Sequence, residues 1–535
     1  MDWLIWNGCI DTFDTDIGRV EALGISGNRV VSAGSLTEVE AMAGPGTVRH
    51  DLGGRAVLPG FIDTHMHLEK ASHEFTMLRL EHARSVADIL AAVSERARNT
   101  APGSWIRCFA DNAAWNESNL VEGRLPTASE LDSVSAGVPV YLYRRPDRAV
   151  INSAGAVAMS DKLSGLDSDS YDPHTGYLSG SSVRVVNDAI YVLGMSDKRF
   201  RLDILADACR TLLAMGITSV ADPGLAGAFD SAWELYTELR AEGRLPQRIR
   251  LMNRFDWRKP FDDEYSRVTA GKVLPGTGDD RLQAWSLKIL LDGEFVDAWM
   301  REGESENAHP HYTTAELGTV LRLCADKGWP ICIHAMGGGA IGAIIDAVRS
   351  LGVDRPEHIS IAHAFHLDVL DIRACAELGI RISVNPPLAH VYSDEMRDAW
   401  GPLAARTMPL ASMAALGFRF AAGSDTHPAE PLIGAQIAVT RLAWDGSSFG
   451  AHEALEPRRA LEMYTRDAGD YLGMPDLGTL AVGSIADLVC WPKDPLSIDV
   501  STWHEQRPLW VVVDGHLVMG DSIASTSPQL QRTSR

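Results

Sequence analysis

Two histidines stand two residues apart directly after an apolar, strand-like segment, in the sequence PGFIDTHMHLEK. On extended backbone, side chains at positions i and i+2 point to the same face, so His65 and His67 can reach one metal ion together. A His-X-His pattern is a weak signal alone, and the chain has a second copy at His309 and His311. The first copy is the stronger candidate because it follows a predicted buried strand.

Four further potential ligands lie within or at the ends of other predicted strands: Lys288 in WSLKILLD, His334 ending ICIH, His363 ending ISIAH and Asp425 ending FRFAAGSD. The carboxyl ends of the strands of a parallel barrel meet on one face, where active sites are built. Each residue alone could be an ordinary core or loop residue, but the set of six predicts a metal centre. Imidazole and carboxylate ligands suit zinc or a similar divalent ion, with one or two ions in each chain.

Apolar runs of four to eight residues alternate with helical patterns through the middle of the chain, as in parallel strands joined by crossover helices. Eight strands are predicted, at 56–63, 217–222, 248–255, 285–292, 331–334, 359–363, 381–385 and 418–425. Predicted helices that end at a glycine, as helices commonly do, cover 201–216, 314–328 and 367–379. An α/β fold that closes into a (β/α)8 TIM barrel is the simplest arrangement of these elements.

The gap between the first and second predicted strands is far longer than the roughly 30 residues of one βα unit. We therefore expect a cap subdomain inserted after strand 1, at 73–195. Its own strand-like runs are WIRCFAD at 105–111 and VPVYLYRR at 138–145.

Short strands broken by glycine-containing turns occur at both ends of the chain. They predict a composite β-sandwich domain built from 1–55 and 475–525. The barrel would then comprise 56–72 and 196–474.

The composition excludes several classes of protein. With 45% hydrophobic and 22% charged residues, the chain has the composition of a globular protein. A formal net charge of −22 without a basic run argues against nucleic-acid binding. Seven scattered cysteines without a CxxC pair favour reduced thiols. The absence of a signal-peptide pattern and of a long apolar span predicts a cytoplasmic protein without membrane contact. A homodimer is expected because it is the commonest oligomer.

The chain resembles the amidohydrolase superfamily and, within it, amidohydrolase family 3, the YtcJ-like metal-dependent hydrolases. The resemblance covers nearly the whole chain, and its most specific motifs are LPGFIDTHMHL, LKILLDGEF, ICIHAMGGGA, ISIAHA and AAGSDTHPAEPL. It implies a binuclear metal centre. One ion would be held by His65, His67 and Asp425, and a second by His334 and His363.

The same resemblance implies that Lys288 is carboxylated and bridges the two ions, because an ammonium group cannot be a ligand. A bound ion would lower the pKa of its water toward about 7, and Asp425 would act first as general base and then as general acid. The expected reaction is hydrolysis of a non-peptide C–N bond of a small molecule. The bond would belong to an amide, an N-acyl amine, a formamide or a cyclic amide.

The chain departs from the family pattern near the expected substrate site. Where the family usually shows HAIGDRA, Gly338 and Gly339 replace the acid and the base, and Asp147 stands near the place of a family histidine. Substrate identity therefore cannot be taken from the family. An aminohydrolase (deaminase) of a heterocycle is one alternative, although Gly337 stands where such enzymes carry a glutamate. A non-catalytic ligand-binding or regulatory protein is another.

Several residues are candidates for contact with a small-molecule substrate. They are His309, His311, Tyr312, Arg144, Arg145, Trp115 and His427. The two arginines could meet an anionic substrate, or they could only cover the surface. A place in the core of the insert fits Trp115 better than a substrate cage does.

Overall fold

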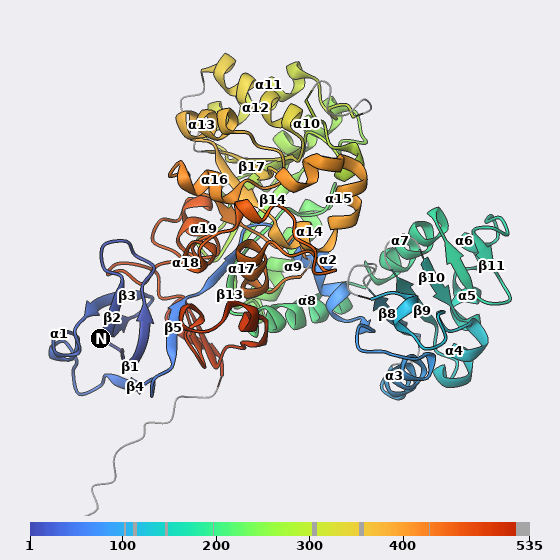
Figure 1. The fold of residues 1–535 in the computed structure, drawn as a ribbon, viewed down its shortest axis with the longest axis horizontal. Helices are drawn as coiled ribbons and strands as arrows, with labels where there is room; N and C mark the ends of the chain where they lie inside the picture. The colour runs from blue at the N-terminus through green and yellow to red at the C-terminus, as the bar shows by residue number, and fades with distance from the viewer. Residues whose placement is uncertain are drawn as a thin grey trace, which may run out of the picture. The chain divides into compact units, whose positions relative to one another are not determined.

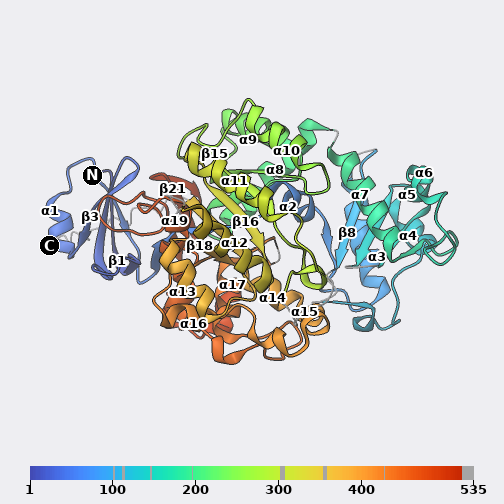
Figure 2. The same ribbon diagram turned by 90° about the horizontal axis from the view of Figure 1, so that it is seen from above.

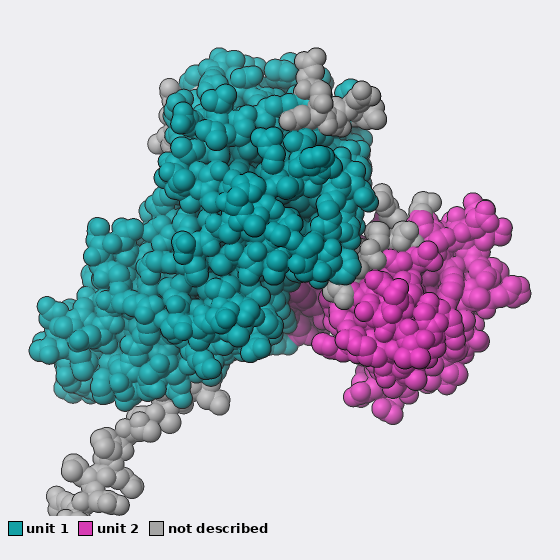
Figure 3. All heavy atoms as spheres, viewed as in Figure 1, with its two compact units in different colours: residues 1–68, 209–535 teal, residues 69–208 magenta. Residues whose placement is uncertain are grey.

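The computed structural model describes two compact units, which Figure 3 shows in different colours. One comprises residues 1–68 and 209–535, and the other comprises residues 69–208. The described residues are all except 101–102, 111–114, 145–147, 196, 302–307, 353–357, 427 and 521–535. This division places both the barrel and the terminal sheet in one unit. The three-part domain division, with its insert at 73–195, stays a prediction.

Eight parallel strands form the barrel of the larger unit (Figure 1). They are β6 (Phe61–Asp63), β13 (Ile217–Asp222), β14 (Arg248–Arg254), β15 (Leu282–Leu290), β16 (Ile331–Ala335), β17 (Ile359–His363), β18 (Arg381–Val384) and β19 (Ala421–Ala422). Each strand pairs with the next in chain order. Backbone hydrogen bonds from Thr64 to Ala422 (3.3 Å) and from Asp425 to His65 (2.7 Å) join the first strand's end to the last. The predicted TIM barrel is confirmed.

The structure corrects the first and last predicted strands. The run 56–63 divides at Gly60, since its first half pairs in the terminal sheet and only its second half enters the barrel. A side chain at position 60 would overlap Thr218. The chain can therefore pass from the terminal sheet to the barrel at this point only because residue 60 is glycine. The last predicted strand keeps two residues in the ladder, because the chain turns sharply at Asp425 and Thr426, whose φ angles are 49° and 86°.

Helices lie around the strands of the barrel, as Figure 2 shows. They are α9 (Phe229–Ala241), α10 (Phe261–Ala270), α11 (Thr314–Lys327), α12 (Gly338–Leu351), α13 (Val369–Leu378), α14 (Pro386–Val391), α15 (Ser393–Trp400), α16 (Leu410–Ala415), α17 (Pro431–Thr440), α18 (Pro457–Glu462) and α19 (Arg466–Tyr471). The predicted helix at 201–216 corresponds to α8 (Lys198–Leu213). None of the helices in the described parts of the chain has the length and apolar run that crossing a membrane needs.

Both ends of the chain contribute to one terminal sheet, which confirms the composite domain. Its order is β22-β21-β20-β5-β1-β2-β3, with β4 paired to β1. The strands are β1 (Trp3–Asp11), β2 (Arg19–Ser26), β3 (Arg29–Gly34), β4 (Val48–Asp51), β5 (Ala56–Pro59), β20 (Leu488–Trp491), β21 (Trp510–Val513) and β22 (His516–Met519), and α1 (Leu36–Ala41) follows β3. Strands β5 and β20 join the N-terminal part to the C-terminal part.

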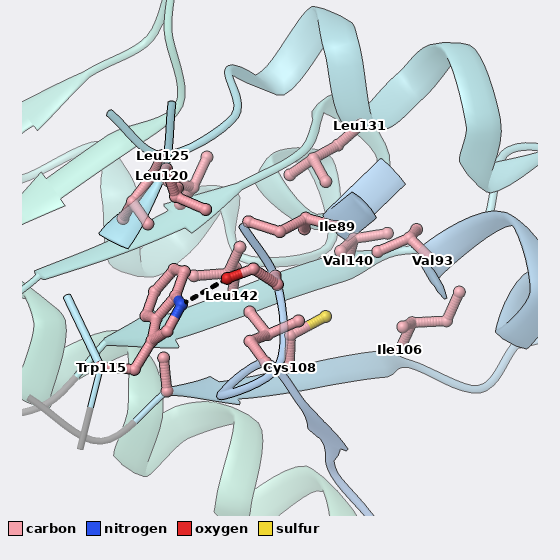
Figure 4. Close-up of a cluster of buried hydrophobic side chains, with 14 of the residues drawn as sticks. Ile89, Val93, Ile106, Cys108, Trp115, Leu120, Leu125, Leu131, Val140 and Leu142 are labelled. Atoms are coloured by element: carbon pink, nitrogen blue, oxygen red, sulfur yellow. Dashed lines mark hydrogen bonds between the residues drawn. The ribbon is translucent and has the colours of Figure 1, made fainter. Parts of the chain in front are cut away.

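The smaller unit has its own sheet, in the order β11-β12-β10-β9-β8-β7. Its strands are β7 (Leu78–Arg79), β8 (Ile106–Ala110), β9 (Val140–Arg144), β10 (Arg148–Ile151), β11 (Tyr171–Asp172) and β12 (Tyr177–Ser179), and its longer helices are α2 (Leu68–Phe75), α3 (Val86–Arg98), α4 (Ala128–Ser135) and α7 (Ser181–Met195). A separate hydrophobic core lies between β8, β9 and α3 (Figure 4). Trp115 is 1% exposed in this core and donates from Nε1 to the carbonyl of Ala83 (3.0 Å), which fits a core role.

A buried ion pair ties the barrel to the terminal sheet. Arg248, at the start of β14, donates to Asp487 (3.0 Å) and to Asp514 (2.6 Å), and its side chain is 2% exposed. Asp487 precedes β20, and Asp514 follows β21. Removing one partner from such a pair leaves the other charge buried without compensation, which is costly.

We therefore expect Arg248→Met to lower stability by about 3–5 kcal/mol. The matched control is Arg240→Met, since Arg240 pairs with Asp279 on the surface and should contribute about 0–1 kcal/mol. The midpoint of thermal unfolding measures both. An equal effect of the two variants would contradict the structural role of Arg248.

Candidate metal centre

Three of the predicted ligands meet where the barrel closes. His65 and His67 follow β6, and their Nε2 atoms lie 3.9 Å and 3.6 Å from Oδ1 of Asp425, which follows β19. Ligand atoms of the three residues all lie within 4.8 Å of one another. Two imidazoles and a carboxylate at this spacing can hold one divalent ion.

Two further histidines continue the cluster around the barrel. The ring of His363 lies 4.7 Å from that of His65 and 4.4 Å from that of His334, measured between centroids. His363 ends β17 with a φ angle of 76°, so the chain turns away directly after it. Lys288, on β15, is buried nearby and donates from Nζ to Sγ of Cys332 (3.4 Å). The structure thus gathers all six predicted residues at one end of the barrel.

Backbone carbonyls orient two of the imidazoles. Nδ1 of His67 lies 2.9 Å from the carbonyl oxygen of Gly224, and Nε2 of His334 lies 3.2 Å from that of Gly293. A carbonyl oxygen can only accept, so each of these nitrogens carries the proton in the neutral ring. The other nitrogen is then free of hydrogen, which is the form that binds a metal ion.

The donor set fits a metal ion. The Nδ1 atom of His363 is buried and has no hydrogen-bond partner among the described residues, which is costly unless something else binds there. Burial lowers the pKa of the His65 and His363 imidazoles well below the usual value, and burial lowers the pKa of His334 to about 3. Neutral imidazoles therefore face one another, ready to act as ligands.

Asp292 belongs to the site but was not among the predicted residues. It follows β15 and accepts hydrogen bonds from the backbone N–H groups of Met336 (3.0 Å), Gly337 (2.9 Å) and Trp299 (3.0 Å). Its Oδ1 lies 3.6 Å from Nε2 of His334. Burial raises the pKa of Asp292 to about 7, and the backbone N–H groups pull it the other way. Asp292 thus joins the loop after β15 to the residues that follow β16, beside the candidate ligand His334.

Asp63 has the same kind of role on the other side of the site. It accepts from the backbone N–H groups of His65 (2.9 Å) and Ser424 (3.1 Å), and burial raises its pKa to about 7. It therefore fixes the backbone of the candidate ligand His65 and of Ser424, which precedes Asp425. In both cases the sequence signal was an acid that ends an apolar run.

The candidate substrate residues after β15 have different environments. His309 is exposed, whereas Tyr312 is buried and packs edge-on against Phe255. His311 stacks on Trp257, with centroids 4.0 Å apart and planes 8° apart. This last pair offers a flat ring surface at the loops that follow β14 and β15.

The remaining candidates lie in the smaller unit or outside the described residues. Arg144 is 7% exposed and its Nε lies 3.3 Å from a carboxylate oxygen of Glu117. Arg145, His427 and Asp147 lie outside the described residues. Substrate contact by all of these residues stays a prediction.

The glycines at the start of α12 are explained by a loop that lies across them. The carbonyl oxygen of Trp299 accepts hydrogen bonds from the N–H groups of Gly339 (2.9 Å) and Ala340 (3.2 Å). A Cβ atom at Gly337 would overlap this carbonyl, and one at Gly339 would lie 2.6 Å from the carbonyl oxygen of Met300. Longer side chains at these positions therefore have no room.

Gly338 differs from its neighbours because its Cβ would meet a side chain. The nearest atom is Nη1 of Arg301, at 2.6 Å. The end of an arginine side chain can move at little cost, whereas a backbone carbonyl held by hydrogen bonds cannot.

We expect Gly339→Ala to lower stability by about 1–3 kcal/mol through overpacking, despite the better helix propensity of alanine. Gly338→Ala is the matched control, and it should stay within about 1 kcal/mol of the wild type, because Arg301 can move. Thermal unfolding of the two variants makes the comparison. If Gly338→Ala were the more damaging change, the loop would not explain these glycines.

Comparison with known proteins identifies the family of the chain. The Amidohydro_3 model, which describes the amidohydrolase family, matches residues 50–519. The chain is 25% identical to the N-substituted formamide deformylase of Arthrobacter pascens, covering 96% of this chain and 98% of that protein. It is 24% identical to the putative amidohydrolase YtcJ of Bacillus subtilis (strain 168), covering 96% and 99%.

Solved structures share the fold. An uncharacterized metal-dependent hydrolase from Pyrococcus furiosus has a TM-score of 0.73 at 24% identity, covering 92% of this chain and 100% of that chain. Atrazine chlorohydrolase TrzN from Arthrobacter aurescens TC1, complexed with zinc, has a TM-score of 0.54 at 16% identity, covering 97% and 95%. The family model spans most of the chain. The chain therefore belongs to the amidohydrolase family and is a hydrolase that acts on carbon–nitrogen bonds.

Proposed function

We propose that the protein hydrolyses a non-peptide C–N bond of a small amide, N-acyl amine, formamide or cyclic amide, with a divalent metal ion as cofactor. The observation that carries this proposal is the cluster of His65, His67 and Asp425 at the closure of the barrel, with ligand atoms within 4.8 Å of one another. The similarity to a formamide deformylase supports an acyl group as small as formyl.

The described side chains suggest which residues would hold the metal. His65, His67 and Asp425 would hold one ion, and His334 and His363, whose rings are 4.4 Å apart, would hold a second. A bound divalent ion, with zinc the first candidate, would acidify a water molecule and polarise the scissile carbonyl. The number of ions, one or two, is part of the proposal.

Asp425 is the group that would move the proton. Its carboxylate Oδ1 lies 3.6 Å from Nε2 of His67, and its backbone N–H donates to the carbonyl of His65 (2.7 Å), which fixes its position. Asp425 would accept a proton from the attacking water and deliver it to the leaving nitrogen. Water then adds across the C–N bond, so the products are a carboxylic acid and an amine.

Lys288 would serve as a bridging ligand after carboxylation. Burial lowers the pKa of its ammonium group, which increases the share of uncharged amine that can react with carbon dioxide. Its present partner, Sγ of Cys332 at 3.4 Å, is a weak acceptor, so little holds the side chain in the uncarboxylated form.

Metal content tests the ligand set directly. We expect about two equivalents of metal per chain in protein purified without chelator, measured by inductively coupled plasma mass spectrometry. Lys288→Met should lower the content to about one or less, because a bridging ligand is lost. Cys332→Ala is the control, since its loss leaves every proposed ligand in place. Two equivalents in Lys288→Met would exclude the bridge.

Turnover tests the role of Asp425. We expect Asp425→Asn to lower kcat on a small formamide by about 100- to 10,000-fold, because proton transfer is lost. Metal content is measured on the same sample, so that loss of a ligand and loss of a base are separated. Full turnover with the metal retained would contradict the proposed role. Ammonia release from an aminoheterocycle, with no amide turned over, would instead favour a deaminase.

A further inference from the structure

Arg254 lies at the proposed metal centre and has no role in the mechanism described so far. It is the last residue of β14, and its partner in the parallel ladder is Lys288 on β15. Paired residues on neighbouring strands point to the same face of a sheet. Burial lowers the pKa of Lys288 and of His334, and the charge of Arg254 lowers both further. Burial also lowers the pKa of Arg254, and the charge of Asp425 opposes that shift. Arg254 is therefore within electrostatic reach of three proposed site residues.

The guanidinium of Arg254 has no hydrogen-bond or ion-pair partner in the part of the chain that the structure describes. Its Nε is buried without a hydrogen-bond partner, and no ion pair to it occurs among the described residues. Three other arginines in or near β14 do have carboxylate partners: Arg248 with Asp487, Arg258 with Asp256, and Arg267 with Glu264. Arg254 is partly exposed, so a ligand can reach its guanidinium, and a ligand would supply the acceptor that its buried Nε–H does not find in the chain.

The nearby acids do not pair with this charge. Asp425, Asp256 and Glu294 affect the pKa of Arg254, but Asp256 is already held by Arg258 at 2.7 Å and none of the three forms an ion pair with Arg254 among the described residues. Arg254 therefore leaves a positive charge beside Lys288 that an anionic ligand would complement better than a neutral one.

The loops around Arg254 also offer a flat apolar surface. Trp257, three residues further along, stacks on His311 and is 42% exposed. These rings follow the ends of β14 and β15, the two strands that carry Arg254 and Lys288. A cation beside an exposed aromatic pair suits a ligand with an acidic group and an apolar part.

We propose that Arg254 binds a carboxylate of the substrate, so that the substrate is an N-acyl amine with an acidic group close to the scissile amide; this inference rests on the proposed hydrolytic function. The planar guanidinium presents several N–H donors that match a carboxylate. In the reaction, the C–N bond breaks, the water oxygen bonds to the acyl carbon, and a proton passes to the nitrogen. The substrate's own carboxylate is unchanged throughout.

A matched pair of substrates tests the inference. N-formylphenylalanine and N-formyl-2-phenylethylamine differ only in the carboxylate. We expect the wild type to prefer the acid in kcat/KM by about 10- to 100-fold, as for one charge-assisted hydrogen-bond pair. Arg254→Met should raise KM for the acid by the same factor with little change in kcat, and should leave the neutral compound within about 3-fold. Arg254→Lys should recover part of the loss.

Arg258→Met provides the matched control, because Arg258 is exposed and already paired with Asp256. This variant should leave kcat/KM for both substrates unchanged. A second readout does not require turnover: calorimetry with 3-phenylpropionate should show about 10- to 100-fold weaker binding to Arg254→Met than to the wild type. Binding of 3-phenylpropanol should be the same for both proteins.

The outcomes separate this inference from the proposed function. If the wild type hydrolyses both formamides equally and Arg254→Met changes neither, the function stands and the inference is wrong. If no formamide or amide is hydrolysed but 3-phenylpropionate binding depends on Arg254, the anion site stands and the function is wrong. Equal losses on both substrates, together with lower metal content in Arg254→Met, would show that Arg254 supports Lys288, and would overturn the inference.

Discussion

The closure of the barrel is the constraint on which the site depends. His65 and Asp425 come from opposite ends of the barrel sequence, and the backbone hydrogen bond between them (2.7 Å) is also a bond that closes the barrel. Asp63 strengthens the same closure, because it accepts hydrogen bonds from the backbone N–H groups of His65 and of Ser424. Ligand spacing is therefore set by backbone geometry rather than by flexible side chains, which keeps the ligands in place without an ion.

The two ends of β14 carry arginines with different surroundings. Arg248 begins β14 and is held by two carboxylates of the terminal sheet, so its charge serves stability. Arg254 ends the same strand with a buried Nε that has no partner. The amino end of β14 contacts the terminal sheet, whereas its carboxyl end lies where ligand sites of such barrels are built.

The sequence predicted which residues gather at the candidate site better than it predicted the residues that support them. His334, His363 and Asp425 each end a short apolar run, and parallel topology brings such ends together whatever their separation in the chain. Asp63 and Asp292 also end apolar runs, but an acid there is equally typical of a turn, and their backbone partners are set by tertiary contacts. The division at Gly60 was missed for the same reason, since one apolar run serves two sheets. Arg254 resembles Arg248 in sequence, and only long-range contacts distinguish them.

One departure from the family pattern, Gly339, has a physical cause in the loop after β15. The carbonyl oxygen of Trp299 in this loop accepts hydrogen bonds from Gly339 and Ala340, and a Cβ atom at position 339 would lie 2.6 Å from the carbonyl oxygen of Met300. The loop therefore leaves no room there for the basic side chain of the family pattern. The positive charge that the proposed anion site needs comes from Arg254, whose ladder partner on β15 is Lys288. Its place at the end of a barrel strand gives that charge a rigid backbone support.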